Sequence, residues 1–404
     1  MTGVRGVARV ELRKRLERAI RGGHPWVFRD ALAGTPRLPD GAVVQIGARG
    51  GRALALGFWD ARSPIAVRII GDAKAVGDVP AIVAARIEAA LARRLAFIDR
   101  RETDAFRWIH GEADGLPGVH VDLYGEAASV RCDGAGAAAF YRGLLDQLRE
   151  AAAAAGIALR TVVERRSARR GGSAGGEDRT AVVLGRAPAR EIEVRENGLR
   201  FGVDLLHGQK GGLFLDQRDN RALVRTLASG RSVLNLFAYT GGFSIYAAAG
   251  GARATVTVDA AAPAIAAARS NFERNRLPTG EARFVSGDAF AFLEQAARAG
   301  ERFDVVISDP PSFAPSRRAL ATGLRAYRRL HRLCAAVTAP GGTLCAASCS
   351  SHVDAAAFLA TVRDGAADAG RRFQLHELRR AGADHPVIPP FPEGDYLKFA
   401  VGIL

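Results

Sequence analysis

The second half of the chain, from about residue 200, alternates short apolar runs with helical patterns. The apolar runs predict strands at 233–237, 255–258, 282–285, 303–308 and 342–347. Helical periodicity fills the intervals at 242–249, 261–276, 289–299, 320–337 and 354–369. Continuous apolar strands joined by helices are typical of a parallel sheet with both faces covered. Two further strands, at 373–378 and 396–402, follow without a helix between them, so one of them is expected to be antiparallel. We therefore expect a doubly wound α/β domain over 191–404 that ends in a hairpin.

The first half of the chain is organised differently. Between residues 1 and 75, alternating segments at 42–46, 53–59 and 65–70 are separated by Gly and Pro turns, which predicts a small β-barrel. An opening helix is predicted to carry the basic residues Arg13, Lys14, Arg15, Arg18 and Arg21. The barrel holds four large aromatic residues: Trp26, Phe28, Phe58 and Trp59. They could stack on bases, but most of them are expected to form the barrel core.

Residues 76–190 predict a central α+β domain. A helix at 80–101 leads out of the barrel, and two hairpin-like strand pairs are expected on either side of a second helix at 137–155. The segment 167–178 is rich in Gly, Ser and Arg and predicts a mobile loop, because it has nothing to bury.

Composition and charge narrow the class of protein. The chain has 404 residues, which suggests two or three domains, and its 48% hydrophobic and 25% charged residues exclude wholesale disorder. The net charge is +15, from 57 basic and 42 acidic residues. This favours a polyanionic partner such as nucleic acid, although the scarcity of lysine also fits the coding bias of a GC-rich genome. No transmembrane helix or secretory signal is expected, and four cysteines without CxxC spacing fit a reducing cytoplasm. The eight histidines lack ligand spacing, so no metal site is expected.

The ends of the first three strands of the α/β domain suggest a nucleoside site. The first ends at 235–243, which lacks GxGxxG but contains Gly241 and Gly242, where a ligand could approach the backbone closely. Asp259 ends the second strand, where an acid can accept both ribose hydroxyls, and Asp288 follows the third, where it could take an adenine amino group. Acids without a phosphate cradle suit the cationic sulfonium of S-adenosylmethionine. Each acid could instead be a helix N-cap.

The fourth and fifth strand ends carry candidate chemistry. Asp309, Pro310 and Pro311 follow the fourth strand, where the proline pair predicts a rigid turn that holds Asp309 over the cleft. Phe313 could stack on a flat substrate. Cys349 ends the fifth strand ahead of a helix, which predicts a lowered thiol pKa and a possible nucleophile. The other cysteines, Cys132, Cys334 and Cys345, are expected to be inert or to lie in another domain.

With these residues in view, the chain resembles the PUA-domain-containing, S-adenosylmethionine-dependent methyltransferases that make 5-methylcytosine in 23S ribosomal RNA. Four strings carry the resemblance: GGHPWVF at 22–28, EADGLPG at 112–118 followed by VDLYG at 121–125, GQKGGLFLDQR at 208–218 with Asn220 and Arg221, and DHP at 384–386 through PEGDYLK at 392–398. The resemblance implies a PUA-like domain over 1–75, a central α+β domain over 76–190 and a Rossmann-like class I methyltransferase domain over 191–404. Gly211 stands where the family usually has Thr, and Ala260 where it often has Ser; both changes could alter cofactor affinity.

The resemblance also implies roles for residues. Cys349 would add to C6 of cytosine, and Asp309 would hydrogen-bond the N3 edge of the ring. The implied cofactor-binding residues are Phe214, Asp216, Gln217, Arg218, Asn235, Phe237, Tyr239, Thr240, Gly241, Asp259, Asp288, Ala289, Asp309 and Pro310. The implied contacts with substrate RNA are Lys210, Pro311, Phe313, Arg13, Lys14 and Arg15. The implied partner is ribosomal RNA, and a homodimer is plausible.

Three other functions stay open at this point. An N-methyltransferase would need the Asp309-Pro310-Pro311 turn but no cysteine. A non-catalytic RNA-binding or ribosome-assembly factor would have a vestigial cofactor pocket, against which the acids Asp259 and Asp288 argue. An NAD-dependent oxidoreductase is disfavoured, because GxGxxG is missing.

Overall fold

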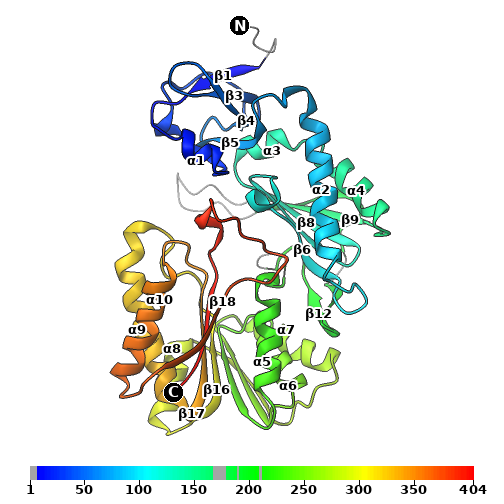
Figure 1. Ribbon diagram of the computed structural model, residues 1–404. Coiled ribbons are helices and arrows are strands. Elements are labelled where there is room, and N and C mark those ends of the chain that lie inside the picture. Colours follow the sequence, from blue (N-terminus) through cyan, green and yellow to red (C-terminus); the bar gives the residue numbers. More distant parts are fainter. Residues whose placement is uncertain (1–6, 167–178, 189–190, 209–211) are drawn as a thin grey trace. The chain divides into compact units, whose positions relative to one another are not determined.

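The computed structural model describes residues 7–166, 179–188, 191–208 and 212–404 (Figure 1). The chain divides into two compact units. The first unit comprises Met1–Arg190, Leu205–His207 and Asp384–Gly394, and the second comprises Glu191–Asp204, Gly208–Ala383 and Asp395–Leu404. The loop predicted at 167–178, and Lys210 and Gly211, lie outside the described residues. The division of 1–190 into a barrel and a central domain stays a prediction.

The first unit opens with a five-stranded sheet of order β1-β3-β4-β5-β2. Its strands are β1 Ala8–Glu11, β2 Trp26–Phe28, β3 Val43–Gly47, β4 Ala53–Trp59 and β5 Ile65–Asp72. Only the β1–β3 pair is parallel among the paired strands of this sheet. Phe58 and Trp59 are fully buried, as expected of core residues, whereas Phe28 is 41% exposed.

The prediction of a basic opening helix is wrong in its extent. Helix α1 covers only Glu17–Arg21. Arg13 and Lys14 lie before it, because their backbone N–H groups donate to the carbonyl of Ala31 rather than to a helical turn. Their side chains reach Asp30: Arg13 donates to its carbonyl at 2.8 Å, and Lys14 pairs with its carboxylate at 2.5 Å.

A second five-stranded sheet, of order β10-β9-β8-β7-β6, continues the first unit. Its strands are β6 Ala105–His110, β7 Val119–Tyr124, β8 Ala127–Cys132, β9 Thr161–Arg166 and β10 Arg179–Leu184. Strands β8 and β9 pair in parallel, and the chain between them passes through helices. The two hairpin-like pairs expected from the sequence correspond to a β6–β7–β8 meander and to the β9–β10 hairpin.

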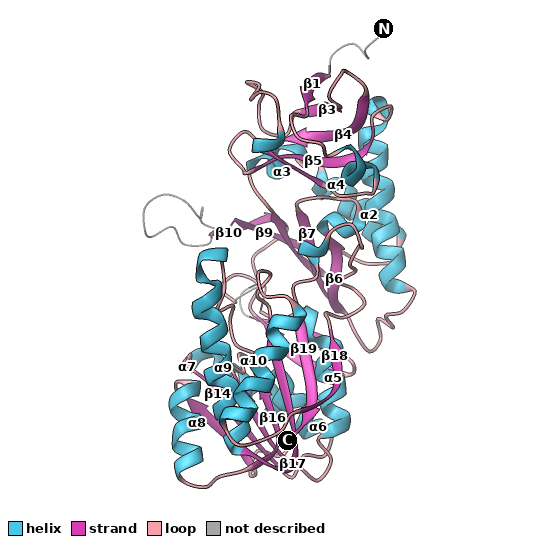
Figure 2. Ribbon diagram, turned by 60° about the vertical axis from the view of Figure 1, so that its left-hand side comes forward, coloured by secondary structure: helices cyan, strands magenta, loops and turns pink. Residues whose placement is uncertain are grey.

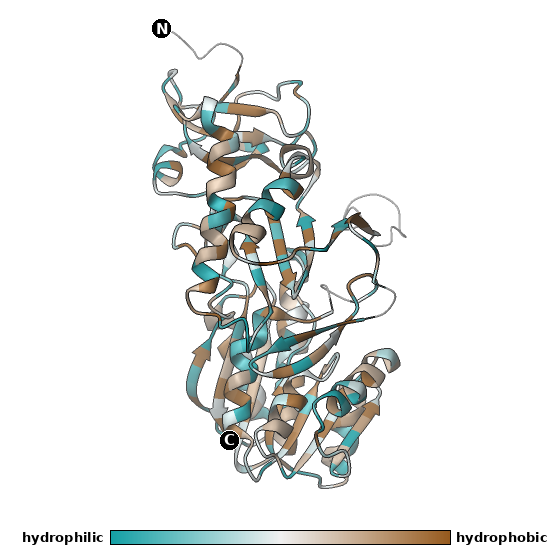
Figure 3. Ribbon diagram, turned by 90° about the vertical axis from the view of Figure 1, so that its right-hand side faces the viewer, coloured by the Kyte–Doolittle hydropathy of each residue, from teal (hydrophilic) through white to brown (hydrophobic). Residues whose placement is uncertain are grey.

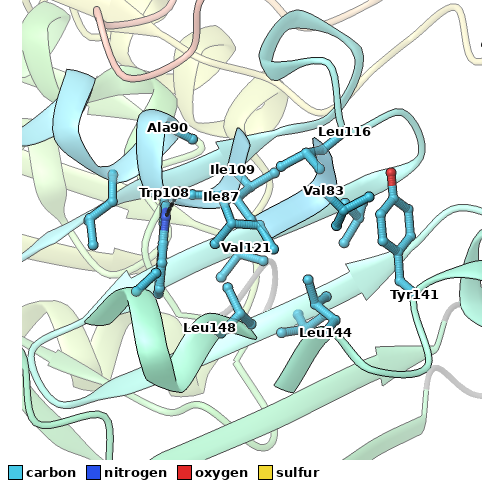
Figure 4. Packing of buried hydrophobic residues seen from close by; sticks show 14 of the residues in the cluster. Val83, Ile87, Ala90, Trp108, Ile109, Leu116, Val121, Tyr141, Leu144 and Leu148 are labelled. Atoms are coloured by element: carbon cyan, nitrogen blue, oxygen red, sulfur yellow. Dashed lines mark hydrogen bonds between the residues drawn. The ribbon is translucent and has the colours of Figure 1, made fainter. Parts of the chain in front are cut away.

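Two predicted helices of this region end differently from expectation. Helix α2 spans Val79–Leu95 and stops short of residue 101; the chain then turns and Ile98 enters the core. Figure 3 shows polar and apolar residues alternating along this helix. Its apolar side packs on the sheet, where Trp108 donates to the Ile87 carbonyl at 3.1 Å (Figure 4).

The helix predicted at 137–155 is two helices, α3 Ala135–Phe140 and α4 Leu144–Ala154. The break has a packing cause. Phe140 stacks on Phe58 with ring centroids 4.4 Å apart, and the Tyr141 hydroxyl donates to the Pro117 carbonyl at 3.2 Å. These two contacts fix residues 140 and 141 in the core and interrupt the helix between α3 and α4.

The second unit is built on a seven-stranded sheet of order β15-β14-β13-β16-β17-β19-β18. Its strands are β13 Ser232–Leu236, β14 Ala254–Asp259, β15 Ala282–Ser286, β16 Phe303–Ser308, β17 Thr338–Ser348, β18 Gln374–Arg379 and β19 Lys398–Ile403. The four pairings that join β15, β14, β13, β16 and β17 are parallel, as predicted, and β19 runs antiparallel to both β17 and β18, which confirms the terminal hairpin. Figure 2 shows β16, β17 and β19 in this sheet.

Helices cover both faces of this sheet. They are α5 Arg218–Leu227, α6 Gly242–Ala249, α7 Ala262–Arg274, α8 Ala289–Arg298, α9 Leu320–Val337 and α10 Ala355–Asp368. Figure 1 shows α9 and α10 on one side and α5 and α6 on the other. Because successive strand residues point to opposite faces, Val305 and Ile307 pack with α5 and α6 while Val306 packs with α8, α9 and α10. The doubly wound α/β fold is confirmed.

A hairpin and a helix of the second unit were not predicted. Strands β11 Ile192–Glu196 and β12 Leu199–Val203 pair antiparallel around a turn at Asn197 and Gly198, whose φ angles are 50° and 78°. Asn-Gly is the strongest short-range hairpin signal, so this turn was available from the sequence. Helix α5 was the unpredicted helix. In the described part of the chain, each helix is too short or too polar to span a membrane.

Candidate active site

The loop that follows β13 is held in a strained conformation. Phe237 and Tyr239 have positive φ angles of 55° and 49°, although neither is glycine. Gly241 follows at φ 80°, and a Cβ there would lie 2.8 Å from the Cβ of Ala268. Backbone outliers of this kind persist only where the surroundings impose them, and they concentrate at ligand sites. The donation from the Asn271 side chain to the Thr240 carbonyl at 3.2 Å helps to hold the loop.

Asp259, at the end of β14, is tied to the same loop. Its carboxylate accepts from the Tyr239 backbone N–H at 2.8 Å and from the Ala261 N–H at 2.9 Å. An ionised carboxylate has about four acceptor positions, so two backbone bonds leave capacity for a pair of ribose hydroxyls. The residues present therefore fit the ribose of an adenosine. Phe214 contacts Tyr239 edge to face, with ring centroids 5.3 Å apart.

Asp288 performs the N-cap role that the sequence left open. It is exposed, and its carboxylate accepts from the Ala291 N–H at 2.9 Å at the start of α8. Its contact with adenine stays a prediction. Beside it, Ala289 is buried and Phe290 belongs to a chain of rings. Phe237, Phe290, Phe313 and Tyr327 follow one another with centroid separations of 6.5, 6.3 and 4.8 Å. The ring of Phe290 therefore lies between Phe237 of the predicted cofactor loop and Phe313, the predicted RNA contact.

Asp309 is positioned by residues that come from the matched 216–221 segment. The amide of Gln217 donates to the Asp309 carboxylate at 3.0 Å, and Asn220 donates to Gln217 at 2.6 Å. Arg379 in turn donates to the Asn220 oxygen at 3.0 Å. Sequence reasoning gave no role to Asn220, Arg379 or Tyr396, although the first and the last stand in the quoted strings.

Asp216 and Arg218, on either side of Gln217, are both buried. The Tyr396 hydroxyl donates to the Asp216 carboxylate at 2.6 Å, and Arg218 donates to Asp219 at 3.1 Å. The structure therefore joins Gln217 to Asp309 by a hydrogen bond, and Asp216, the neighbour of Gln217 in the chain, is held separately by Tyr396. Asn235, which is buried in β13, donates to the Ser244 hydroxyl at 3.0 Å. Pro310 is buried and Pro311 is exposed.

Cys349 follows β17 at the edge of the sheet where Asp309 follows β16. It is partly exposed, whereas Cys334 and Cys345 are fully buried, and burial raises the pKa of each of these two thiols to about 12. Burial, reinforced by Glu164, likewise raises the pKa of Cys132 to about 12. Helix α10 begins six residues after Cys349, and Asp354 caps its first turn by accepting from the Ala357 N–H at 2.8 Å.

The predicted RNA contacts Arg13, Lys14 and Arg15 belong to the first unit, and Lys210 lies outside the described residues. Across the described ranges, no cluster of three or more His, Cys, Asp or Glu side chains is arranged to hold a metal ion.

Comparison with known proteins places this geometry in a family. Residues 121–388 match the family described as S-adenosylmethionine-dependent methyltransferase, and residues 10–71 match a PUA-like domain. Ribosomal RNA large subunit methyltransferase I of Aeromonas salmonicida is 37% identical over 397 residues, covering 96% of this chain and 97% of that protein. The protein of the same name from Photobacterium profundum is 37% identical over 394 residues, covering 96% and 97%.

Solved structures share the fold. A candidate SAM-dependent methyltransferase from Streptococcus mutans superposes with a TM-score of 0.82 at 23% identity, covering 98% of this chain and all of that one. A candidate methyltransferase complexed with SAH gives 0.81 at 23% identity, covering 98% and 99%. These structures confirm the expected fold, and the family matches confirm the PUA-like domain and the expected cofactor, S-adenosylmethionine. The chain belongs to the S-adenosylmethionine-dependent methyltransferase family, among relatives named ribosomal RNA large subunit methyltransferase I.

Proposed function

We propose that this methyltransferase transfers a methyl group to C5 of a cytosine in large-subunit ribosomal RNA, with Cys349 as the nucleophile. One observation carries the proposal. Cys349 and Asp309 follow neighbouring parallel strands at one edge of the sheet, and Cys349 is partly exposed there while Cys334 and Cys345 of the same unit are fully buried. A nitrogen methyltransferase has no need of an accessible thiol at that place.

The chemistry explains why a thiol is needed. C5 of cytosine is too weak a nucleophile to attack a sulfonium unaided. The Cys349 thiolate adds to C6, which makes C5 electron-rich; after C5 is methylated, loss of its proton and departure of the thiolate restore the ring. Asp309, oriented by Gln217, hydrogen-bonds the N3 edge of the ring and stabilises the adduct that is protonated at N3. S-adenosylmethionine supplies the methyl group on a sulfonium and leaves as S-adenosylhomocysteine.

The cofactor would lie over the strained loop after β13. In this proposal Asp259 receives the ribose hydroxyls, Phe237 and Tyr239 line the site, and Asp288 and Ala289 contact the adenine. The same site would include Phe214, Asp216, Gln217, Arg218, Asn235, Thr240, Gly241, Asp309 and Pro310.

Replacing Asp259 with Ala is expected to raise the Kd for S-adenosylmethionine at least about tenfold, because each lost hydrogen bond to a charged group costs roughly 1.5–3 kcal/mol. Isothermal titration calorimetry measures this. Asp368→Ala, which removes an exposed pair with Arg328, is the matched control and should leave the Kd unchanged. An unchanged Kd in Asp259→Ala would remove this carboxylate from the ribose site.

The substrate class follows from the names of the relatives and from charge. Those relatives are named for the large ribosomal subunit, and a chain of net charge +15 with a PUA-like domain suits RNA. Arg13, Lys14 and Arg15 would contact its backbone, and Lys210, Pro311 and Phe313 would contact the target. A paired base cannot reach a strand-end cysteine, so the cytosine must be unpaired or flipped out. A cytoplasmic location and a homodimer stay predictions.

A trapping assay tests the proposal. Ribosomal RNA that has been transcribed with 5-fluorocytidine in place of cytidine is incubated with the protein, with and without S-adenosylmethionine. Fluorine cannot leave as the proton does, so a C5 enzyme is expected to accumulate a cofactor-dependent covalent complex that survives denaturing electrophoresis. Methylated RNA without a covalent complex would point to nitrogen methylation instead. If the protein neither methylates the RNA nor binds the cofactor, an RNA-binding or assembly role would be favoured.

A further inference from the structure

Lys398 is a buried lysine beside the loop that carries Cys349. It is the first residue of β19, and in the antiparallel pairing of β19 with β17 it stands opposite Ser348, the residue before Cys349. Only 6% of Lys398 is exposed. Its Nζ donates to the Ser350 carbonyl at 2.7 Å and to the Tyr396 carbonyl at 2.8 Å. Burying a lysine lowers the stability of the fold unless its ammonium group is hydrogen-bonded or paired, because desolvation disfavours the charged form.

The charges around Lys398 favour its ammonium form. Burial lowers the pKa of Lys398, and Asp395, Cys349 and Asp354 oppose that effect as negative or ionisable groups close by. Asp395 is itself paired with Arg380 at 3.1 Å, and Asp354 is occupied as the N-cap of α10. Cys349 thus lies within electrostatic reach of the Lys398 ammonium.

The other side of the Cys349 loop is held by hydroxyl groups. The Ser350 hydroxyl lies 2.9 Å from those of Ser312 and Tyr327, and the Ser348 hydroxyl donates to Tyr327 at 2.9 Å. Ser312 belongs to the turn that follows Asp309, so Ser350 ties the Asp309 turn to the Cys349 loop. Burial raises the pKa of the Tyr327 hydroxyl, and the charge of Cys349 adds to this effect. These hydroxyl groups fix the loop without bringing a positive charge to the sulfur.

We propose that Lys398 is a positioning residue for Cys349: its ammonium holds the loop backbone through the Ser350 carbonyl and favours the thiolate of Cys349 over the thiol. This inference rests on the proposed function, in which Cys349 is the nucleophile. Opposite charges a few ångströms apart favour each other's charged form by about one to three pH units. Because only the thiolate attacks, a neutral side chain at position 398 leaves less of the nucleophile available at neutral pH.

The test is the pH dependence of Cys349 alkylation by iodoacetamide in the full-length protein, followed by peptide mass spectrometry so that Cys132 is counted separately. Lys398→Met and Lys398→Gln are expected to raise the alkylation midpoint by at least about one pH unit, a roughly tenfold slower reaction at pH values below it. Lys398→Arg keeps the charge and should shift the midpoint by much less. Lys74→Met removes an exposed lysine of the first unit and should leave the midpoint unchanged.

The outcomes separate the two ideas. A midpoint that does not move in Lys398→Met and Lys398→Gln would overturn the role of Lys398. A variant that merely unfolds is recognised because Cys334 and Cys345 then become alkylated with the pH dependence of ordinary exposed thiols. In that case Lys398→Gln, which keeps a hydrogen-bond donor, and Lys398→Arg decide. In the methylation assay, loss of kcat that recovers as the pH rises, with KM for the cofactor unchanged, supports the positioning role. Methylation retained by Cys349→Ala would overturn the proposed function itself, whatever the alkylation profile.

Discussion

Cys349→Ala is expected to lower methyl transfer to ribosomal RNA by more than about 10³-fold and to leave the Kd for S-adenosylmethionine within about twofold. The loss is large because the covalent route has no substitute once the nucleophile is removed. Cofactor binding should persist because the loop after β13 and Asp259 do not depend on Cys349. Transfer of a labelled methyl group measures the first quantity and calorimetry the second.

The matched control is Cys132→Ala, which alters a partly buried cysteine of the first unit and should keep its activity. Digestion of the product RNA to nucleosides then identifies the modified base. Activity within tenfold of the unaltered enzyme in Cys349→Ala would contradict covalent catalysis and favour methylation of a nitrogen atom.

The second large effect is expected at Glu196. This residue of β11 is fully buried, and its carboxylate receives two hydrogen bonds from Arg221, at 2.8 and 2.6 Å, and one from the Tyr246 hydroxyl at 3.0 Å. Glu196→Ala leaves the Arg221 charge buried without its partner. Breaking a buried ion pair from one side typically lowers the free energy of unfolding by about 3–5 kcal/mol.

Urea denaturation of the full-length protein measures this loss of unfolding free energy. Changing Glu196 to Leu and Arg221 to Met together is the matched control, and it should cost far less, because a hydrophobic pair replaces the charges without leaving one alone. The single change is expected to disturb the site as well, because Arg221 packs against the start of α6: a Cβ added to Gly242 there would lie 2.9 Å from Arg221 Cδ. A loss below about 1 kcal/mol in Glu196→Ala would show that water reaches Arg221.

The elements of the methyltransferase domain could be predicted closely, because the signal for them is local. Strand β16 at Phe303–Ser308 and helix α9 at Leu320–Val337 begin and end where the apolar run and the helical period predict. Predictions failed where tertiary contacts overrule periodicity. The helix expected at 137–155 breaks because Phe140 and Tyr141 are anchored in the core, and α2 ends early because Ile98 turns inward.

The candidate site shows the same division. Position at the end of a parallel strand was enough to single out Asp259, Asp309 and Cys349, since the carboxyl ends of such strands meet at one edge of the sheet. Position could not reveal that Gln217 orients Asp309 from 92 residues away, or that Lys398 lies beside the Cys349 loop. Side-chain partners of this kind depend on how β19 and the 216–221 segment pack.

By itself, then, the sequence determined the fold class, the order of strands and helices from β13 onward and the class of cofactor, because apolar periodicity and strand-end chemistry are properties of neighbouring residues. Only the tertiary structure decided the membership of Asp384–Gly394 in the first unit, where the Asp384 carboxylate accepts from the Arg107 N–H 277 residues away and its carbonyl accepts from Arg94 at 2.8 Å. The contribution of such hydrogen bonds to stability depends on the burial of both partners, and which groups are buried depends on the packing of segments that are distant in the sequence.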